Sequence, residues 1–150
     1  MKVRDFFERY QGFGILILFI IIVFGHYANA MPSNPETIAM VDSVRAEIEE
    51  QDIEHPEIVL RQSIWETGWY KCKYCSWKYN NLFGFRHKSW VTEDNPQGYL
   101  KFDTWQDAVA YYKRWQDKRY QGGDYYNFLI NIGYAADGEK YVKHLKSLSL

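Results

Sequence analysis

The chain has 150 residues, and its 18 lysines and arginines nearly balance its 19 acidic residues. This balance lacks the basic excess of a nucleic-acid-binding domain, so we expect no nucleic acid as a partner. The length suffices for one domain with a modest core and is too short for two.

The first thirty residues have the pattern of an export signal. Basic residues precede an apolar run over residues 12–24, and Ala28-Asn29-Ala30 supplies the small residues of a cleavage site. The run is short for a bilayer span. We therefore expect a cleaved signal peptide over residues 1–30, with an uncleaved membrane anchor through residues 12–24 as the alternative. Either leader exports residues 31–150, as one domain, to the periplasm or cell envelope or beyond it.

Charge is unevenly distributed after the leader. Without residues 1–30, 15 of the 18 cations and 17 of the 19 acids remain. Residues 61–90 contain six lysines and arginines, with Glu66 as their single acid. A basic, aromatic stretch of this kind suits a polyanionic wall polymer as partner, and ordinary solvated lysines are the alternative interpretation.

The residues after the leader predict helices joined by short loops. Apolar residues recur every three or four positions over residues 36–51, which predicts a first helix. Pro56 suits the first position of a second helix that runs to about Glu66. Gly68 suits the left-handed turn that ends this helix.

The next segment has a different pattern. Aromatic and apolar residues on both sides of the turn-rich segment 93–98 predict a small β-hairpin over residues 85–102. Three further helices are expected over residues 105–118, 125–131 and 138–148. Each follows a residue that caps helices well, namely Thr104, Asp124 and Asp137. The predicted class is therefore mainly α (α+β), a helical domain with one small hairpin.

Glu66 is the strongest candidate for a catalytic residue. It lies at the end of the second predicted helix, between Trp65 and Trp69 in the sequence. The negative pole of the helix dipole and the apolar rings both favour its protonated form near neutral pH. A carboxyl group with this property is what general acid catalysis requires.

All six tryptophans fall between residues 65 and 115. Flat aromatic faces bind sugar rings, and large aromatic residues also fill the cores of small domains. We expect Trp69 and Trp90 to bind substrate because they lie near Glu66 in the sequence. Trp105 and Trp115 recur at helical spacing, which favours packing.

Three motifs stand in order along the chain. They are His55-Pro-Glu-Ile-Val-Leu-Arg-Gln-Ser-Ile-Trp-Glu-Thr-Gly68, Asn80-Asn-Leu-Phe-Gly-Phe-Arg86, and Gly133-Tyr-Ala-Ala-Asp137 with Tyr141 beyond it. Together they resemble the glucosaminidase domain of glycoside hydrolase family 73, over about residues 37–148. The resemblance implies a lysozyme-like fold and hydrolysis of the β-1,4 bond after N-acetylglucosamine in the glycan strands of peptidoglycan. It implies no cofactor.

The resemblance also implies roles for single residues. Glu66 matches the general acid that protonates the departing glycosidic oxygen. Asn81, Phe83 and Gly84 match a loop beside the catalytic helix, where Asn81 orients either the loop or the substrate and Phe83 suits packing. Tyr134 matches an aromatic residue that lines the cleft, with a core position as the alternative. We therefore place Asn81, Phe83 and Tyr134 among the substrate-binding residues.

Two-acid glycosidases need a second carboxylate as base or nucleophile. Glu93 is the best candidate, and Asp94 and Asp103 are its neighbours in and after the predicted hairpin turn. The N-acetyl group of the substrate is an equal alternative as nucleophile. Two other functions also stay open: a lytic transglycosylase, which shares the single acid, and a wall-binding or assembly module without turnover.

Cys72 and Cys75 form a Cys-x-x-Cys pair. A zinc site would need two further ligands at suitable spacing, and the histidines are scattered, so we expect no metal. A thioredoxin-like redox centre would need a βαβ setting that the pattern lacks. A local disulfide suits an oxidising compartment, and free thiols are the alternative.

Overall fold

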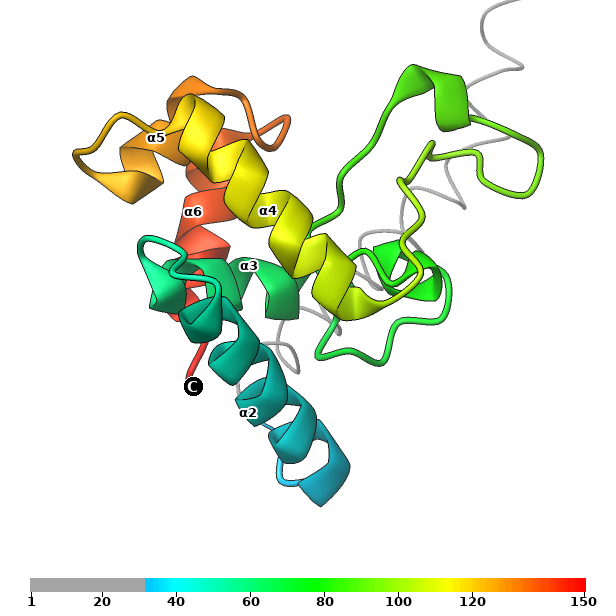
Figure 1. Cartoon of the computed structure of the whole chain (residues 1–150), viewed down its shortest axis with the longest axis horizontal. Helices are drawn as coiled ribbons and strands as arrows, with labels where there is room; N and C mark the ends of the chain where they lie inside the picture. The colour runs from blue at the N-terminus through cyan, green and yellow to red at the C-terminus, as the bar shows by residue number, and fades with distance from the viewer. Residues whose placement is uncertain (1–31) are drawn as a thin grey trace, which may run out of the picture.

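The computed structural model of the chain describes residues 32–150, and the expected leader over residues 1–30 lies outside them. The described part contains five α-helices and two short 3-10 helices (Figure 1). This confirms the predicted mainly helical class and is consistent with a lysozyme-like domain. No helix within residues 32–150 combines the length and the apolar character that crossing a bilayer requires.

The first two helices meet in the core. Helix α2 (Pro35–Glu50) begins after Asn34, whose side chain accepts hydrogen bonds from the backbone N–H groups of the first turn. Helix α3 (Pro56–Thr67) has proline at its first position and ends at Gly68, which has a φ of 55°. The two helices pack against each other through apolar side chains. The buried face of α2 includes Val41, Val44 and Ile48.

Three further α-helices complete the domain. They are α4 (Trp105–Arg119), α5 (Tyr125–Asn131) and α6 (Gly138–Ser147). Each has the expected cap, and α4 begins with the complete capping box of Thr104 and Asp107. Figure 1 shows α4 running across the molecule, with α5 and α6 on one side of it. Helix α3 packs against both α2 and α6.

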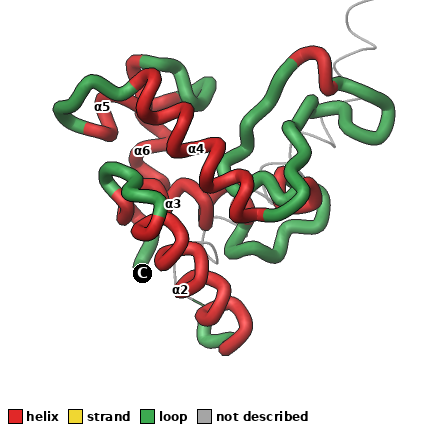
Figure 2. The backbone as a smooth tube through the Cα atoms, in the orientation of Figure 1, coloured by secondary structure: helices red, strands yellow, loops and turns green. Residues whose placement is uncertain are grey.

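The segment between α3 and α4 consists mostly of loops. Figure 2 shows it on one side of the molecule, opposite α5 and α6. It contains the 3-10 helices η1 (Ser76–Tyr79) and η2 (Lys88–Trp90), which the sequence did not predict. Its path brings the motif over residues 80–86 back to the end of α3.

The hairpin expected over residues 85–102 forms only in part. The chain reverses, but its pairing is limited to two isolated antiparallel bridges, Arg86 with Tyr99 and Thr92 with Asn95. The buried Asn95 side chain explains this difference. Its amide donates to the carbonyls of Trp90 (3.0 Å) and Tyr99 (2.9 Å), and its oxygen accepts from the Tyr99 N–H (3.1 Å). One side chain thus replaces the ladder bonds that a strand pair would make.

Candidate active site

Glu66 lies on the last turn of α3 and lines a cleft of about 630 Å3. The walls come from the end of α3, the loop over residues 83–86, the C-terminal half of α4, the loop over residues 132–136, and α6. The rigid, buried helix α3 therefore fixes the backbone of Glu66, while its half-buried side chain reaches the cleft. Among the described residues that line this cleft, Glu66 is the only acid.

The surroundings of Glu66 favour its protonated form. Burial is the largest effect and raises the pKa of Glu66 to about 7, while a hydrogen bond with Tyr141 and the positive charge of Arg86 act in the opposite direction. The direction agrees with the sequence prediction, although burial rather than the helix dipole is the main cause. A carboxyl group with this pKa carries a proton for a substantial part of the time at neutral pH, and can donate it.

Asn81 shapes the loop that faces Glu66. Its side chain is fully buried, donates to the carbonyls of Phe85 (2.8 Å) and Leu100 (3.0 Å), and accepts from the N–H groups of Phe83 (3.3 Å) and Phe85 (3.1 Å). All of these partners are backbone groups of the protein. The structure thus places Asn81 behind the cleft, where it orients the loop, and outside the cleft lining.

Tyr134 and Phe83 both line the cleft, as the sequence placed them. The Tyr134 hydroxyl donates to the Phe83 carbonyl at 2.7 Å, and its ring stacks on that of Tyr141 with centroids 5.6 Å apart. This hydrogen bond ties the loop over residues 132–136 to the loop over residues 83–86. The Phe83 side chain is itself buried and packs on Tyr112 at 4.3 Å between centroids, so packing accounts for most of its contacts.

The two tryptophans expected at the substrate lie elsewhere. Trp69 is buried in the hydrophobic core and does not line the cleft. Gly68, Trp69 and Tyr70 all have positive φ, and this left-handed turn carries the Trp69 side chain inward. Trp90, on η2, is 40% exposed and also lies outside the cleft lining.

The candidate second carboxylates do not line the cleft either. Glu93 is exposed within the turn closed by the Thr92–Asn95 bridge, and Asp94 and Asp103 are exposed as well. The structure brings none of the three into the same lining as Glu66. The assignment of Glu93 as base or nucleophile stays a prediction.

Four tryptophan and arginine side chains of the cleft were not assigned to it from the sequence. They are Trp65, Arg86, Trp115 and Arg119. Trp65 precedes Glu66 and stacks on His144 at 4.3 Å between centroids, while Arg86 ends the motif over residues 80–86 and donates to the Tyr99 hydroxyl at 2.8 Å. Trp65 and Arg86 both lie within the motifs described above, so their position in the sequence could have predicted that they line the cleft. Trp115 was expected to pack, and it does pack against the core while also lining the cleft. Arg119 carried no signal in the sequence, because only the fold brings this end of α4 to the cleft.

The structure does not contain the local disulfide expected between the two cysteines. Cys72 and Cys75 are free thiols, and the Cys75 thiol donates to the Cys72 carbonyl at 3.3 Å. Burial raises the pKa of the Cys75 thiol to about 12, which favours an unreactive thiol. Within residues 32–150, no group of three or more histidine, cysteine or acidic side chains is arranged to hold a metal ion.

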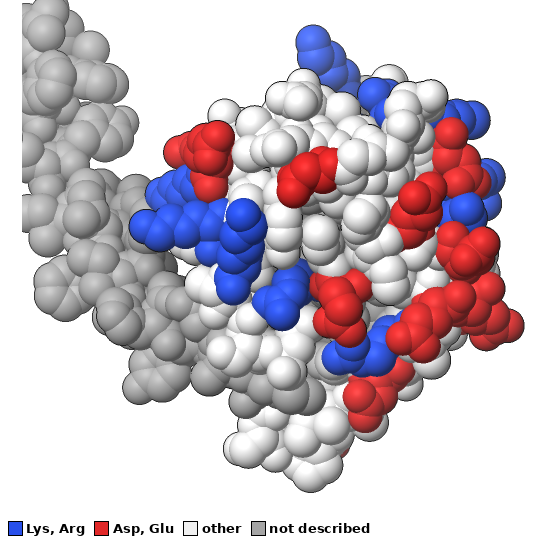
Figure 3. Space-filling view, turned by 90° about the vertical axis from the view of Figure 1, so that its left-hand side faces the viewer, with Lys and Arg blue, Asp and Glu red and all other residues white. Residues whose placement is uncertain are grey.

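Both signs of charge occur on one face of the molecule. On the face seen in Figure 3, acidic and basic side chains lie side by side and no single sign covers the surface. This distribution matches the near-neutral composition. Within the cleft, Arg86 and Arg119 lie on the same lining as Glu66.

Comparison with known proteins identifies the family. The model of the family described as "Glucosaminidase: Mannosyl-glycoprotein endo-beta-N-acetylglucosaminidase" matches residues 41–149. No curated protein and no solved structure matches the chain significantly. The matched range covers most of the chain, contains Glu66 and the whole of all three motifs, and confirms the resemblance drawn from those motifs. The chain belongs to the glucosaminidase family.

Proposed function

We propose that this protein is an endo-β-N-acetylglucosaminidase that cleaves the β-1,4 bond after N-acetylglucosamine in peptidoglycan, with Glu66 as general acid. The family supports a peptidoglycan hydrolase role in general. The observation that carries the finer assignment is the half-buried Glu66 carboxyl, which lies in a cleft with its pKa raised to about 7. A polymer strand can enter such a cleft and place a glycosidic oxygen beside this acid.

In the proposed reaction, Glu66 transfers its proton to the glycosidic oxygen as the bond from this oxygen to the sugar C1 breaks. The single carboxylate on the cleft lining favours the substrate's N-acetyl oxygen as the group that attacks C1. A water molecule then opens the resulting ring, and ionised Glu66 takes the proton of that water. Glu93 remains the alternative nucleophile or base.

We also propose that the protein acts in the cell envelope. The basic residues, apolar run and small-residue motif of residues 1–30 support export, either with cleavage or as an anchor. A peptidoglycan substrate requires the same location. Fractionation of cells that express the full chain, followed by mass measurement of the mature N-terminus, tests export and cleavage together.

The test of the proposed activity is digestion of purified peptidoglycan by the full chain. Wild-type protein, Glu66→Gln and Glu93→Gln are compared, and the new chain ends are identified by mass spectrometry. New reducing N-acetylglucosamine ends from the wild type and from Glu93→Gln, with none from Glu66→Gln, support a reaction with one protein carboxylate. Loss of activity in both variants assigns the second role to Glu93.

A lytic transglycosylase is the second candidate, because such an enzyme needs one acid and the cleft lining contains one. Anhydromuramic ends in the same digest assign this activity. An absence of new ends, with equal retention of wild type and Glu66→Gln on insoluble peptidoglycan, favours a wall-binding module. The three outcomes are therefore distinguished by which new chain ends form, or by binding without any new ends.

A further inference from the structure

A chain of buried hydrogen bonds connects Glu66 to the far side of the domain. Tyr141 lines the same cleft as Glu66, and its hydrogen bond to the Glu66 carboxyl acts to lower the pKa of that carboxyl. Gln62, one turn before Glu66 on α3, contacts the Tyr141 hydroxyl at 3.3 Å and the Tyr112 hydroxyl at 2.6 Å. Gln62 and Tyr112 are fully buried, and Tyr141 is nearly so. Gln62 has no role in the reaction proposed above.

The direction of these bonds follows from the donor inventory of each group. The 2.6 Å contact has the length of an O–H···O bond, so Tyr112 donates to the amide oxygen of Gln62. The amide nitrogen of Gln62 then faces Tyr141 and donates to its hydroxyl oxygen. A tyrosine hydroxyl has one proton, and that of Tyr141 is left to point at Glu66.

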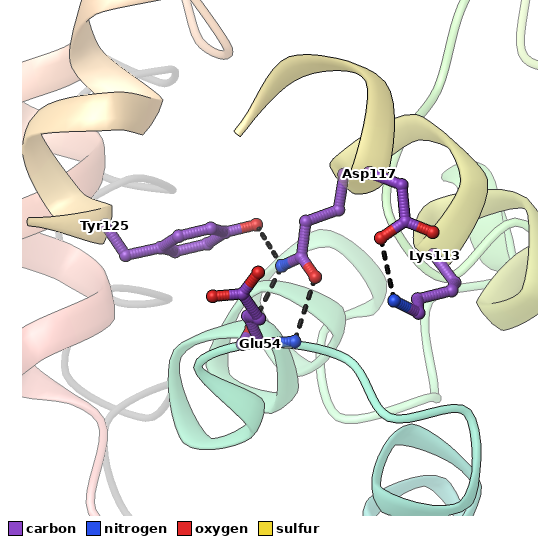
Figure 4. Close-up of polar contacts among 5 residues, drawn as sticks. Glu54, Lys113, Asp117 and Tyr125 are labelled. Carbon is purple, nitrogen blue, oxygen red and sulfur yellow. Dashed lines mark hydrogen bonds and ion pairs between the residues drawn. The ribbon is translucent and has the colours of Figure 1, made fainter. Parts of the chain in front are cut away.

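The backbone of Glu54 anchors the end of this hydrogen-bond network that lies far from Glu66. Gln116 accepts from the Glu54 N–H and donates to the Glu54 carbonyl, both at 2.9 Å, and a backbone N–H can only donate. The same Gln116 amide nitrogen donates to the Tyr125 hydroxyl at 2.9 Å, and Tyr125 lies 2.7 Å from the Tyr112 hydroxyl. Figure 4 shows Glu54 and Tyr125 in this arrangement. Because the Tyr112 proton goes to Gln62, we infer that the Tyr125 hydroxyl donates to Tyr112, so the bonds from Gln116 through Tyr125, Tyr112 and Gln62 all run toward Tyr141.

We propose that Gln62 is a positioning residue that fixes Tyr141 as a hydrogen-bond donor to Glu66, so that the acidic proton of Glu66 stays on the carboxyl oxygen facing the cleft. If the Gln62 amide were reversed, Tyr141 would donate to Gln62 and would accept the proton of Glu66 instead. That proton would then point away from the substrate. The inference rests on the proposed function for its catalytic consequence, and on the contacts above for its structural basis.

The test uses the full chain with Gln62→Met, which removes the amide at similar length, and Tyr112→Phe, which removes the group that orients it. Tyr70→Phe is the matched control, because the Tyr70 hydroxyl is also buried and bonds an α3 side chain, Ser63, at 2.8 Å. Stability of each variant is measured by urea unfolding, so that rates are compared on folded protein.

We expect Gln62→Met to lower kcat about tenfold with little change in KM, because a hydrogen bond to a charged group contributes on this scale. Tyr112→Phe lowers kcat less, and Tyr70→Phe leaves it unchanged. The alkaline limb of the rate also moves to higher pH in Gln62→Met, because Tyr141 donates less strongly to ionised Glu66. Equal loss of rate in Tyr112→Phe and Tyr70→Phe would show a merely structural role and overturn the proposal.

A second readout separates this inference from the proposed function. Carbon-13 NMR of labelled glutamate follows the titration of Glu66 without substrate. A higher pKa of Glu66 in folded Gln62→Met, with no change in Tyr70→Phe, supports the hydrogen-bond direction even if the wild type releases no glycan ends. An unchanged titration of Glu66 in folded Gln62→Met overturns the inference even if the wild type is an active glucosaminidase.

Discussion

Gly84 lies directly against the carboxyl group of Glu66. A Cβ atom built on Gly84 would stand 2.5 Å from Oε2 and 3.1 Å from Cδ of Glu66, and Gly84 has a φ of 67°. Both the contact and the backbone conformation therefore require glycine. Since Oε2 is the free end of a flexible side chain, an added methyl group would displace the carboxyl rather than the loop.

Gly84→Ala is expected to abolish most activity through displacement of the Glu66 carboxyl, with a stability loss of about 1–2 kcal/mol from the left-handed backbone. Gly122→Ala is the matched control, because Gly122 also has positive φ, at 91°, and a Cβ there would meet nothing within 4 Å. Activity and urea unfolding are measured for both variants. Equal activity of the two would contradict a specific effect on Glu66.

Glu66 should make the fold less stable as the pH rises. Its pKa is raised from 4.5 to about 7 in the folded state, mainly by burial. Between these values the folded protein holds a proton that the unfolded chain has released, so an increase in pH favours unfolding. Glu66→Gln is therefore expected to match the wild type at pH 4 and to be more stable at pH 8, by about 3 kcal/mol at most.

Urea unfolding at pH 4, 6 and 8 measures this difference. Glu93→Gln is the control variant, because it removes a carboxylate from an exposed residue. Its stability should follow the wild type across the range. A Glu66→Gln curve parallel to that of the wild type would show that the carboxyl is not destabilised by burial.

Asn81→Ala should reduce stability and activity together, because it leaves buried backbone groups of the 80–86 loop without partners. We expect a loss of about 2–4 kcal/mol from the free energy of unfolding. Asn95→Ala removes a comparable buried clamp from the loop near Tyr99 and should cost similar stability. If Asn81 contacts substrate directly, its variant will instead raise KM while unfolding as the wild type does.

Local signals in the sequence predicted the helices well. The predicted ends of the helices agree with the structure to within about one residue, because caps such as Asn34, Asp124 and Asp137 act on neighbouring backbone groups. The placement of Glu66 on the last turn of α3 follows from the same signals, together with Pro56 and the left-handed Gly68. The carboxyl of the candidate site was therefore predictable from a short stretch of chain.

Contacts between distant segments were not predictable in this way. Proximity to Glu66 in the sequence favoured Trp69 as a substrate contact, but a left-handed turn of three residues buries its ring. The alternation of residues 85–102 favoured a hairpin, but the Asn95 side chain takes up the backbone groups that strands would pair. Trp115 and Arg119 reach the cleft because the fold places the C-terminal half of α4 on the same lining as the end of α3. Each difference depends on tertiary structure.

Arg86→Gln should move the pH dependence of the reaction. The positive charge of Arg86, which is held over the Tyr99 ring at 4.6 Å, lowers the pKa of Glu66. Removing the charge raises this pKa, so Glu66 keeps its proton to higher pH and the alkaline limb of the initial rate moves upward. Arg119→Gln is the matched control, because Arg119 lines the same cleft but is not among the groups that shift Glu66. Release of glycan ends is measured between pH 4 and 9 for both variants. The prediction is contradicted if the alkaline limb of Arg86→Gln stays where it is in the wild type, or if it moves equally in both variants. Either result would show that the charge of Arg86 does not set the ionisation of Glu66 that limits the rate.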